Sequence, residues 1–354
     1  MESLKSKILR NQIIIPIAAL LALALFNLIV DPSFYAVKLD KSSSGNLVLS
    51  GNLISILDYG SELAILAIGM TLVTASCGGQ DISVGAGIAI AGSVILRILC
   101  GTNTKADHMH APLILAFAAA CIVSMIFSAF NGVLVAHFKI QPMVATLILY
   151  TAGRSIAAWI NLNKLPTLTD DRFKVYGGFI SGIPVPTPIF IAAACIIVMA
   201  IVLKVTNLRL YTQAVGINEN SARLNGLNPK MIKILSFVIL GLCVAIAGLI
   251  KVSRLSTINY SVIAKDIEMD AILAVALGGN ALSGGKFNLT ASVLGAYVIQ
   301  FLTTTLYKYK VDSNALPAYK AIVVIILVVV SSPVFREKIK NLTKNMKASN
   351  KEVA

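Results

Sequence analysis

Charged side chains are scarce in this sequence: Asp, Glu, Lys and Arg together make up 13% of its 354 residues. A soluble globular domain carries about 25% charged residues. So few polar side chains cannot solvate the surface of a 37.5 kDa protein, which excludes an ordinary soluble enzyme. Hydrophobic residues make up 57% of the chain. They predict an all-α, polytopic transmembrane helical bundle, in which lipid replaces water around the protein.

Cysteine and histidine are too few and too scattered to indicate a disulfide framework or a metal site. His108 and His110 lie two apart in a polar loop, and such a pair alone is not a metal-binding motif. The cysteines are expected to be small buried hydrophobic residues, because no C-x-x-C occurs and most lie inside apolar runs. The five are Cys77, Cys100, Cys121, Cys195 and Cys243.

A nucleotide-binding motif is missing as well. Residues 278–287 are rich in glycine, but a phosphate-binding loop needs G-x-x-x-x-G-K followed by Ser or Thr. Asn280 stands where the first glycine belongs, and Phe287 follows Lys286. Neither G-x-S-x-G nor H-E-x-x-H occurs, and no pair of carboxylates is clustered as in a hydrolase. We therefore expect no catalytic residue and no cofactor in this chain.

The formal net charge is +14, but the basic residues are scattered between apolar runs and form no basic soluble face. This distribution is typical of membrane topology, in which Lys and Arg collect in cytoplasmic loops, and it does not indicate nucleic-acid binding. The basic tail at 335–354 is predicted to be cytoplasmic, either solvated or in contact with anionic membrane lipid. The first apolar run lacks a signal-peptide cleavage site and is interpreted as a retained span.

Ten apolar runs are candidate membrane spans, for which about 17–25 residues are needed. Three of them, 53–76, 82–99 and 268–284, are rich in glycine and are expected to be broken or re-entrant. No long linker separates the runs, so residues 1–354 are predicted to form a single transmembrane domain. The runs are 13–30, 53–76, 82–99, 111–136, 143–162, 188–206, 232–252, 268–284, 288–307 and 319–334.

Ten spans place both termini on the same side of the membrane. With that side cytoplasmic, the inner segments carry more Lys and Arg than the outer ones, as the positive-inside rule requires. The proline-rich stretch 163–187 is then an external loop, and 207–231 is the main cytoplasmic loop.

An internal repeat supports a transporter. G-G-Q-D-I-S-V-G at 78–85 and G-G-N-A-L-S-G-G at 278–285 share one pattern 200 residues apart, and each lies between two apolar runs. Ser83 and Ser283 are predicted to cap the helices that follow. Transporters often contain such repeats, with broken helices near the substrate path. The glycines either serve packing and turns or line the path, and Gln80, Asp81 and Asn280 are the polar candidates for the path.

The cytoplasmic loop contains a short helix with a stop signal at each end. Asn218 is predicted to cap this helix, and Gly226 to end it in the left-handed conformation. Asn228-Pro229 begins the next span in the same way. Glu219 and Arg223 are four apart and are predicted to pair. Such a short helix is marginal alone, so it is either a plain surface helix or one that docks into a groove on another protein.

Three motifs resemble those of sugar-type ABC importer permeases, the family of the ribose permease. G-M-T-L-V-T-A-S-C-G-G-Q-D-I-S-V-G-A at 69–86 is similar to its G-M-T-x-V…G-G-I-D-L-S-V-G signature. A-L-G-G-N-A-L-S-G-G-K-F at 276–287 is similar to its A-L-G-G-x-S-L-x-G-G, and 214–228 resembles its cytoplasmic loop. The resemblance covers about 50–334. Gln80 departs from the isoleucine that the family often has, and Cys77 occupies a variable position.

The resemblance implies a bacterial cytoplasmic-membrane importer with both termini cytoplasmic. Its partners would be a second permease, identical or different, two cytoplasmic ATPase subunits and an external solute-binding protein. ATP and Mg would be bound by the ATPases, which would move the short cytoplasmic helix. The residues carried over to this coupling segment are Gly216, Glu219, Ala222, Arg223 and Gly226.

A charge inside a span is costly and is therefore a candidate functional residue. Arg154 lies in the middle of run 143–162, near Tyr150 and Trp159, whose rings could stack on the apolar face of a sugar. Asp58 and Glu62 lie on one helix face at the external end, either facing a vestibule or lying among headgroups.

Other functions stay open at this point. Nucleoside and branched-chain amino acid permeases of related groups would show the same coupling segment. A stand-alone secondary transporter or channel would work without an ATPase, and a membrane scaffold would transport nothing. The sequence does not name the sugar, because recognition is largely the task of the binding protein.

Overall fold

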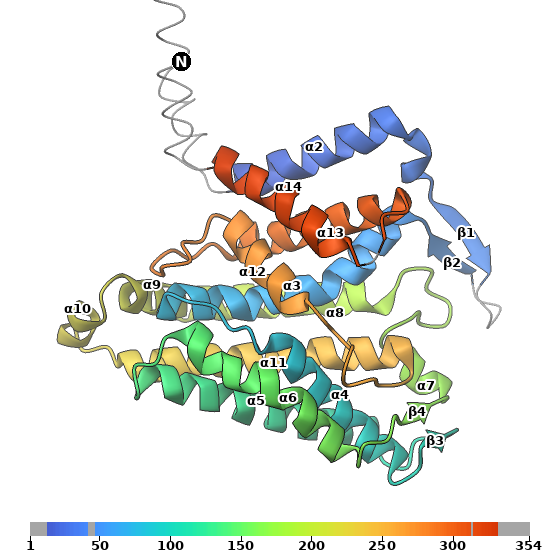
Figure 1. Cartoon of the computed structure of the whole chain (residues 1–354), viewed down its shortest axis with the longest axis horizontal. Helices are drawn as coiled ribbons and strands as arrows, with labels where there is room; N and C mark the ends of the chain where they lie inside the picture. Colours follow the sequence, from blue (N-terminus) through green and yellow to red (C-terminus); the bar gives the residue numbers. More distant parts are fainter. Residues whose placement is uncertain (1–12, 42–46, 313, 332–354) are drawn as a thin grey trace, which may run out of the picture.

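The computed structural model describes residues 13–41, 47–312 and 314–331, and they form an α-helical bundle with two pairs of short strands (Figure 1). The tail at 335–354 lies outside the described residues. In chain order the helices are α2 (Ile14–Val30), α3 (Asn52–Cys77), α4 (Val84–Cys100), α5 (Leu113–Ala136), α6 (Pro142–Ile160), α7 (Asp171–Lys174), α8 (Thr187–Val205), α9 (Leu208–Ile217), α10 (Glu219–Leu224), α11 (Pro229–Leu255), α12 (Ile267–Leu277), α13 (Leu289–Lys308) and α14 (Leu316–Ser331).

Short strands and one 3-10 helix cover a single end of the bundle. The 3-10 helix η1 (Pro32–Tyr35) follows α2. The strands β1 (Lys38–Lys41) and β2 (Leu47–Ser50) form an antiparallel pair. The strands β3 (Lys105–Ala106) and β4 (Thr167–Leu168) form a parallel pair. Figure 1 shows these strands at one end of the bundle, which we call the strand end, and α9 and α10 at the other, which we call the α10 end.

Helix α3 forms the centre of the bundle. It packs against α8, α11, α12 and α13, and most of its residues are buried. The glycines that predicted a broken helix instead allow close packing: a Cβ on Gly69 would lie 2.6 Å from the Cα of Leu240 on α11. Run 53–76 is therefore one continuous helix, and the prediction of a break there is wrong.

The prediction of ten spans is borne out only in part. Within the described residues, six helices are long and apolar enough to cross a membrane: α3, α5, α6, α8, α11 and α13. Helices α2 and α4 are apolar but have 17 residues each. Helix α12 has 11 residues, so it is about 16 Å long, roughly half of a bilayer core of about 30 Å. Run 268–284 is thus a short helix followed by a glycine loop.

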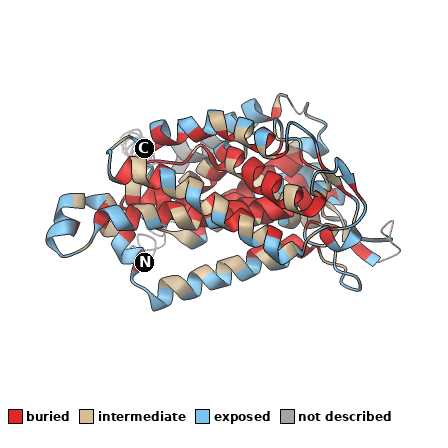
Figure 2. Cartoon of the chain, turned by 90° about the horizontal axis from the view of Figure 1, so that it is seen from below, coloured by how far each residue is buried: buried red, intermediate tan, exposed pale blue. Residues whose placement is uncertain are grey.

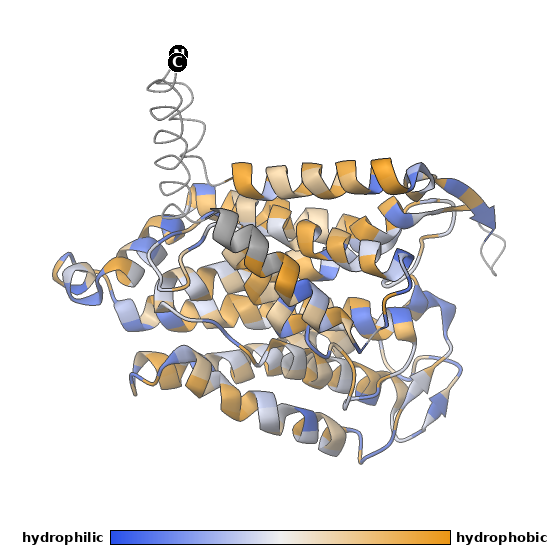
Figure 3. Cartoon of the chain, turned by 45° about the horizontal axis from the view of Figure 1, so that its top comes forward, coloured by the Kyte–Doolittle hydropathy of each residue, from blue (hydrophilic) through white to orange (hydrophobic). Residues whose placement is uncertain are grey.

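Burial and hydropathy follow the pattern of a bundle surrounded by lipid. Buried residues fill the middle of the bundle, where one apolar cluster joins α3, α4, α5, α6, α11, α12 and α13 (Figure 2). Large apolar side chains are exposed along its sides, such as Ile197 and Ile201 on α8. Hydrophilic residues gather at the two ends (Figure 3). The loops predicted to lie on opposite sides, 163–187 and 207–231, are at opposite ends of the bundle.

Candidate functional site

Helix α10 has the stop signals that the sequence predicts. The Oδ1 atom of Asn218 accepts a hydrogen bond from the backbone N–H of Ser221, at 3.0 Å. Gly226 has a φ of +82°, the left-handed conformation that glycine adopts without strain. Asn228 caps α11 through the N–H of Met231, at 3.2 Å, and Pro229 is the first residue of that helix. The predicted ends of this short helix are confirmed.

A second helix in the same loop was not predicted. Helix α9 precedes α10 and turns Leu208, Thr212 and Val215 inward. These three are spaced i, i+4 and i+7, so a signal for an amphipathic helix was present in the sequence. Ala222 on α10 is buried against Val215 and Ile232, which packs α10 onto α9 and α11.

Glu219 pairs with residues outside its own helix. Its carboxylate accepts hydrogen bonds from Lys139, between α5 and α6, and from Lys233 on α11, the latter at 2.8 Å. The predicted pairing with Arg223 is therefore wrong, because the two lysines hold the carboxylate while Arg223 is exposed. Partial desolvation raises the pKa of the Glu219 carboxyl, but the hydrogen bonds from both lysines outweigh it and hold that pKa below its ordinary value.

The two repeats meet each other at Gly216 of α9. A Cβ on Gly216 would lie 1.8 Å from the carbonyl oxygen of Ala75 and 2.6 Å from the nitrogen of Gly285. Gly285 donates its N–H to that same Ala75 oxygen, at 2.9 Å. A Cβ on Gly78 would lie 2.7 Å from the carbonyl oxygen of Ser283. We call this contact of 75–78, Gly216 and 283–285 the glycine junction.

Gln80 links the repeats by a side chain. It is buried, and its Nε2 atom donates a hydrogen bond to the carbonyl oxygen of Leu282, at 3.3 Å. The residue at which this chain departs from the family pattern thus reaches from the first repeat to the second.

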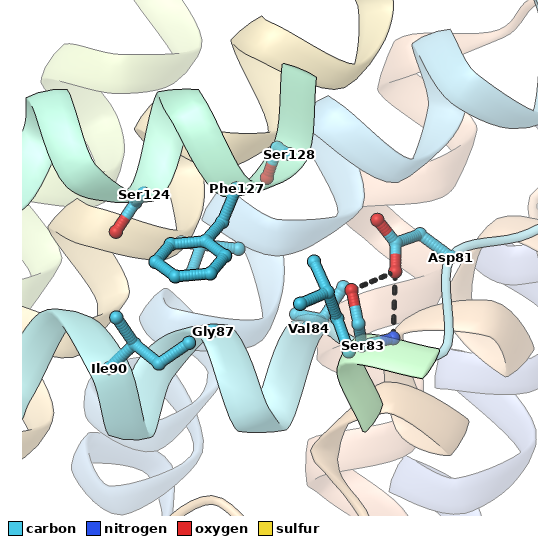
Figure 4. Close-up of a pocket in the computed structure, with 10 residues that line it drawn as sticks. Asp81, Ser83, Val84, Gly87, Ile90, Ser124, Phe127 and Ser128 are labelled. Atoms are coloured by element: carbon cyan, nitrogen blue, oxygen red, sulfur yellow. Dashed lines mark hydrogen bonds between the residues drawn. The ribbon is translucent and has the colours of Figure 1, made fainter. Parts of the chain in front are cut away.

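Ser83 directly precedes α4 but does not cap it as predicted. Both its N–H and its Oγ–H donate to Oδ1 of Asp81, at 2.7 and 2.6 Å (Figure 4). Its Oγ also accepts a hydrogen bond from Nδ2 of Asn131, at 3.0 Å. The Oγ of Ser124, which lacks a hydrogen-bond partner in the described part of the chain, lines a cavity of about 20 Å³ beside Asp81. That volume holds about one water molecule and is too small for a sugar.

In the second repeat, Asn280 and Asn288 make the capping and linking hydrogen bonds. Oδ1 of Asn280 accepts from the N–H of Asn288, at 2.7 Å, and its Nδ2 donates to Ser292, at 2.7 Å, so it joins the end of α12 to the start of α13. Asn288 is the cap of α13, through the N–H of Ala291. Ser283 is exposed and lies six residues before α13, so its predicted capping role is wrong.

Arg154, Tyr150 and Trp159 on α6 do not join the glycine junction. Nη1 of Arg154 donates to the carbonyl oxygens of Tyr260 and Ile263, at 3.0 Å each, and so fixes the segment between α11 and α12. The side chains of Trp159 and Tyr150 are 75% and 37% exposed on the outside of this chain.

The strand end contains a charged cluster in place of isolated carboxylates. Asp58 and Glu62, which share one face of α3, both accept from Arg254 near the end of α11. Glu62 also pairs with Lys251, at 3.0 Å, and the guanidinium of Arg254 lies 4.3 Å from the centre of the Tyr59 ring. The sequence indicated the carboxylate face but not its basic partners. No group of three or more His, Cys, Asp and Glu residues suited to a metal ion occurs among the described residues.

Comparison with known proteins agrees with these features. Residues 52–332 match the family described as branched-chain amino acid transport system / permease component. The galactofuranose transporter permease of Escherichia coli K12 is 36% identical, over 92% of this chain and 91% of that protein. The fructose import permease of Bifidobacterium longum is 34% identical, over 96% and 92%. The ribose import permease of E. coli K12 is 34% identical, over 82% and 88%.

No solved structure matches the chain. The extent of the family match and the six long apolar helices identify a multi-pass inner-membrane protein. The resemblance to ribose-type permeases, inferred from three motifs, is confirmed by the curated relatives. The chain belongs to the family of branched-chain amino acid transport system permease components.

Proposed function

We propose that this chain is the permease subunit of an ATP-driven importer and moves a small sugar that an external solute-binding protein delivers. A separate cytoplasmic ATPase would bind α10 and drive the transport. The observation that carries the proposal is the construction of α10, which has a stop at each end, exposes apolar side chains and is tied to the core through Glu219.

The exposed side of the α10 end is suited to a protein partner. Ile217, Leu224 and Met231 are 74%, 85% and 68% exposed and lie before, in and after α10. The basic residues Arg223 and Lys230 are exposed beside them. Exposed apolar side chains rimmed by charged residues are typical of protein-binding surfaces. An ATPase would fit here, and Arg223 would belong to its contact.

Two contacts would transmit a movement of α10 into the bundle. Glu219 connects α10 to Lys233 on α11, which spans the length of the bundle. Gly216 connects α9, directly before α10, to the end of α3 and to the loop that follows α12. Because both contacts are close, α10 cannot shift far without displacing α3, α11 or α12.

The energy source would lie outside this chain. Residues 278–287 fail the phosphate-loop pattern at both ends, and in the fold they form the glycine loop between α12 and α13. ATP and Mg would therefore be bound by the partner ATPase, and this chain would carry no cofactor of its own.

Sidedness follows from the same proposal. The α10 end would face the cytoplasm, together with both termini and the tail at 335–354, which would touch anionic lipid. The strand end would face outward and receive the binding protein.

The shorter helices α2, α4, α12 and α14 would complete ten membrane segments, α12 as a half-length one. A second permease, identical or not, would complete the pathway, and Tyr150 and Trp159 on the outer surface would contact it or lipid.

The relatives favour a sugar as the substrate. The family description names branched-chain amino acids, but the three relatives described above are permeases for galactofuranose, fructose and ribose. A nucleoside or a branched-chain amino acid is the alternative substrate within the same mechanism. A stand-alone secondary transporter is the alternative mechanism, and it predicts a dispensable α10.

The test is to detach α10 without disturbing the bundle. Glu219→Arg would place a third cation beside Lys139 and Lys233, and Gly226→Pro would forbid the positive φ at the end of α10. We expect both variants to insert normally but to lose ATP-driven uptake by about tenfold or more, a coupling loss of about 1.4 kcal/mol. Copurification of the ATPase would fall in parallel.

Asp171→Arg is the matched control, because Asp171 is exposed and lies at the strand end. It should leave ATPase copurification unchanged. Uptake at the wild-type rate in both α10 variants would refute the coupling role of α10.

A further inference from the structure

A polar cavity of about 730 Å³ opens at the strand end between α3, the end of α11, the start of α12 and α13. Its lining on α3 runs from Asn52 to Leu63, and its lining on α13 from Lys308 to Gln300. Ten residues of helix span about 15 Å, so the cavity reaches roughly half the thickness of a bilayer core. Its volume lies in the range of small-molecule sites.

The floor of the cavity lies where α12 begins. Ile267 and Asp270, from the first turn of α12, line it beside Glu62. Because α12 is a half-length helix that leads into the glycine junction, it separates the cavity from the α10 end. Broken helices of this kind are found beside substrate sites in transporters.

Four of the five charged side chains that line the cavity are paired within the chain, and the fifth, Lys265, is exposed. Glu62 pairs with Lys251, at 3.0 Å. Asp270 pairs with Lys320, at 2.8 Å, and Lys308 with Asp31, at 3.1 Å. A charged ligand bound among Glu62, Lys251, Asp270 and Lys308 would have to displace one of these partners. A neutral ligand with many hydroxyl groups needs only the remaining hydrogen-bonding positions of the same carboxylates and amines.

Uncharged polar groups and two aromatic rings complete the site. Gln300, Thr303 and Thr304 are spaced i, i+3 and i+4 on α13 and line one wall. Nε2 of Gln300 makes a long hydrogen bond to Thr304, at 3.4 Å, so its amide is available to a ligand. The rings of Tyr59 and Tyr307 are 46% and 54% exposed and can stack on the apolar face of a sugar ring.

We infer that this cavity binds a neutral monosaccharide on its way through the permease, with Asp270 and Gln300 bonded to its hydroxyl groups and Tyr59 or Tyr307 against its ring. This inference rests on the proposed import of sugar and adds the residues that hold it. The residues of this cavity take the place of Gln80, Asp81, Tyr150 and Trp159, which were the candidates for the path from the sequence. The competing occupant is the phosphate headgroup of an anionic lipid, attracted by the lysines.

The direct test places a thiol in the cavity. Ser55→Cys changes one atom in the cavity wall, and Ser33→Cys, at an exposed site on η1, is the matched control. Each variant is reconstituted with its ATPase and binding protein, and its reaction with a membrane-impermeant thiol reagent is timed. The sugar used is whichever of D-ribose, D-fructose and D-galactose the wild-type complex takes up.

We expect that sugar to slow the reaction of the thiol at position 55 at least about fivefold, relative to an equal concentration of L-glucose, and to leave the thiol at position 33 unaffected. Equal rates with both sugars would overturn the inference. So would protection that depends on the phosphatidylglycerol content of the vesicles and not on sugar, because it would assign the cavity to lipid.

A kinetic test uses the amide. Gln300→Leu should raise the KM for uptake about tenfold with little change in ATPase stimulation by the loaded binding protein. Gln141→Leu, at an exposed glutamine before α6, should leave the KM unchanged. An unchanged KM in Gln300→Leu would contradict the inference. Absence of ATP-driven uptake of all three sugars by the wild-type complex would instead refute the proposed function, so the two failures are distinguishable.

Discussion

Replacing Gly216 with alanine is expected to break the contact between α9 and the end of α3. The added Cβ would lie 1.8 Å from the carbonyl oxygen of Ala75, well inside van der Waals contact, and 2.6 Å from the nitrogen of Gly285. Both neighbours are backbone atoms, so no side chain can rotate away. Forcing an extra carbon into such a site costs about 1–3 kcal/mol.

Two further effects change the expected energetic cost of Gly216→Ala. The hydrogen bond from Gly285 to Ala75, at 2.9 Å, would be strained or lost, at a cost of about 0.5–1.5 kcal/mol. Gly216 lies in the last turn of α9, and alanine is better than glycine in a helix by about 1 kcal/mol. The net destabilisation should be about 2 kcal/mol. We expect a lower unfolding temperature of the purified complex and a larger relative loss of ATP-driven uptake.

The matched control is Gly226→Ala. Gly226 has a positive φ, +82°, but no atom lies within 4 Å of the position of its Cβ, so alanine there should cost only about 1 kcal/mol of backbone strain. Uptake should survive in this control and fail in Gly216→Ala. If Gly216→Ala retains the unfolding temperature and the uptake rate of the wild type, the close contact at the glycine junction is not needed.

Two further predictions concern the ion pairs of α10. Lys233→Met should destabilise the purified complex more than Lys139→Met, because the Lys233 side chain is 10% exposed and the Lys139 side chain 55%. We expect about 1–3 kcal/mol against less than about 1 kcal/mol, measured by thermal unfolding. The pKa of the Glu219 carboxyl lies below its ordinary value of 4.5. Its contribution to stability is therefore complete above pH 4.5. That contribution is lost only as the pH falls through the lower pKa of the folded state. Uptake should therefore not vary with Glu219 ionisation from about pH 6 to 8, and a fall in that range that Glu219→Gln abolishes would contradict this.

The ends of α10 could be predicted because their causes are local. Asn218, Gly226 and Asn228 act on backbone groups within three residues, and each does what its position indicates. The partners of Glu219 could not be predicted in this way. Lys139 lies 80 residues away, and its proximity depends on how α5 and α6 pack.

The contacts between the two repeats also could not be predicted, because they join residues that lie far apart in the sequence. The shared pattern at 78–85 and 278–285 predicted related turns, but not that the two turns would touch each other at Gly78 and Ser283, with Gly216 against the second turn. Ser83 and Ser283 occupy equivalent places in the pattern and yet behave differently, because Asp81 takes the hydroxyl of Ser83 while Asn288 caps the later helix. Helix α12 ends at Leu277 although apolar residues are scattered beyond it, because the glycines after it favour a loop.

Reconstitution into vesicles shows whether transport by this chain depends on a separate ATPase. Vesicles would contain the purified chain alone, the chain with its ATPase, or both with the binding protein, and uptake of labelled sugar would be measured with and without ATP. We expect uptake only in the complete vesicles supplied with ATP, and we expect Glu219→Arg to abolish it. Concentrative uptake by the chain alone would contradict this expectation.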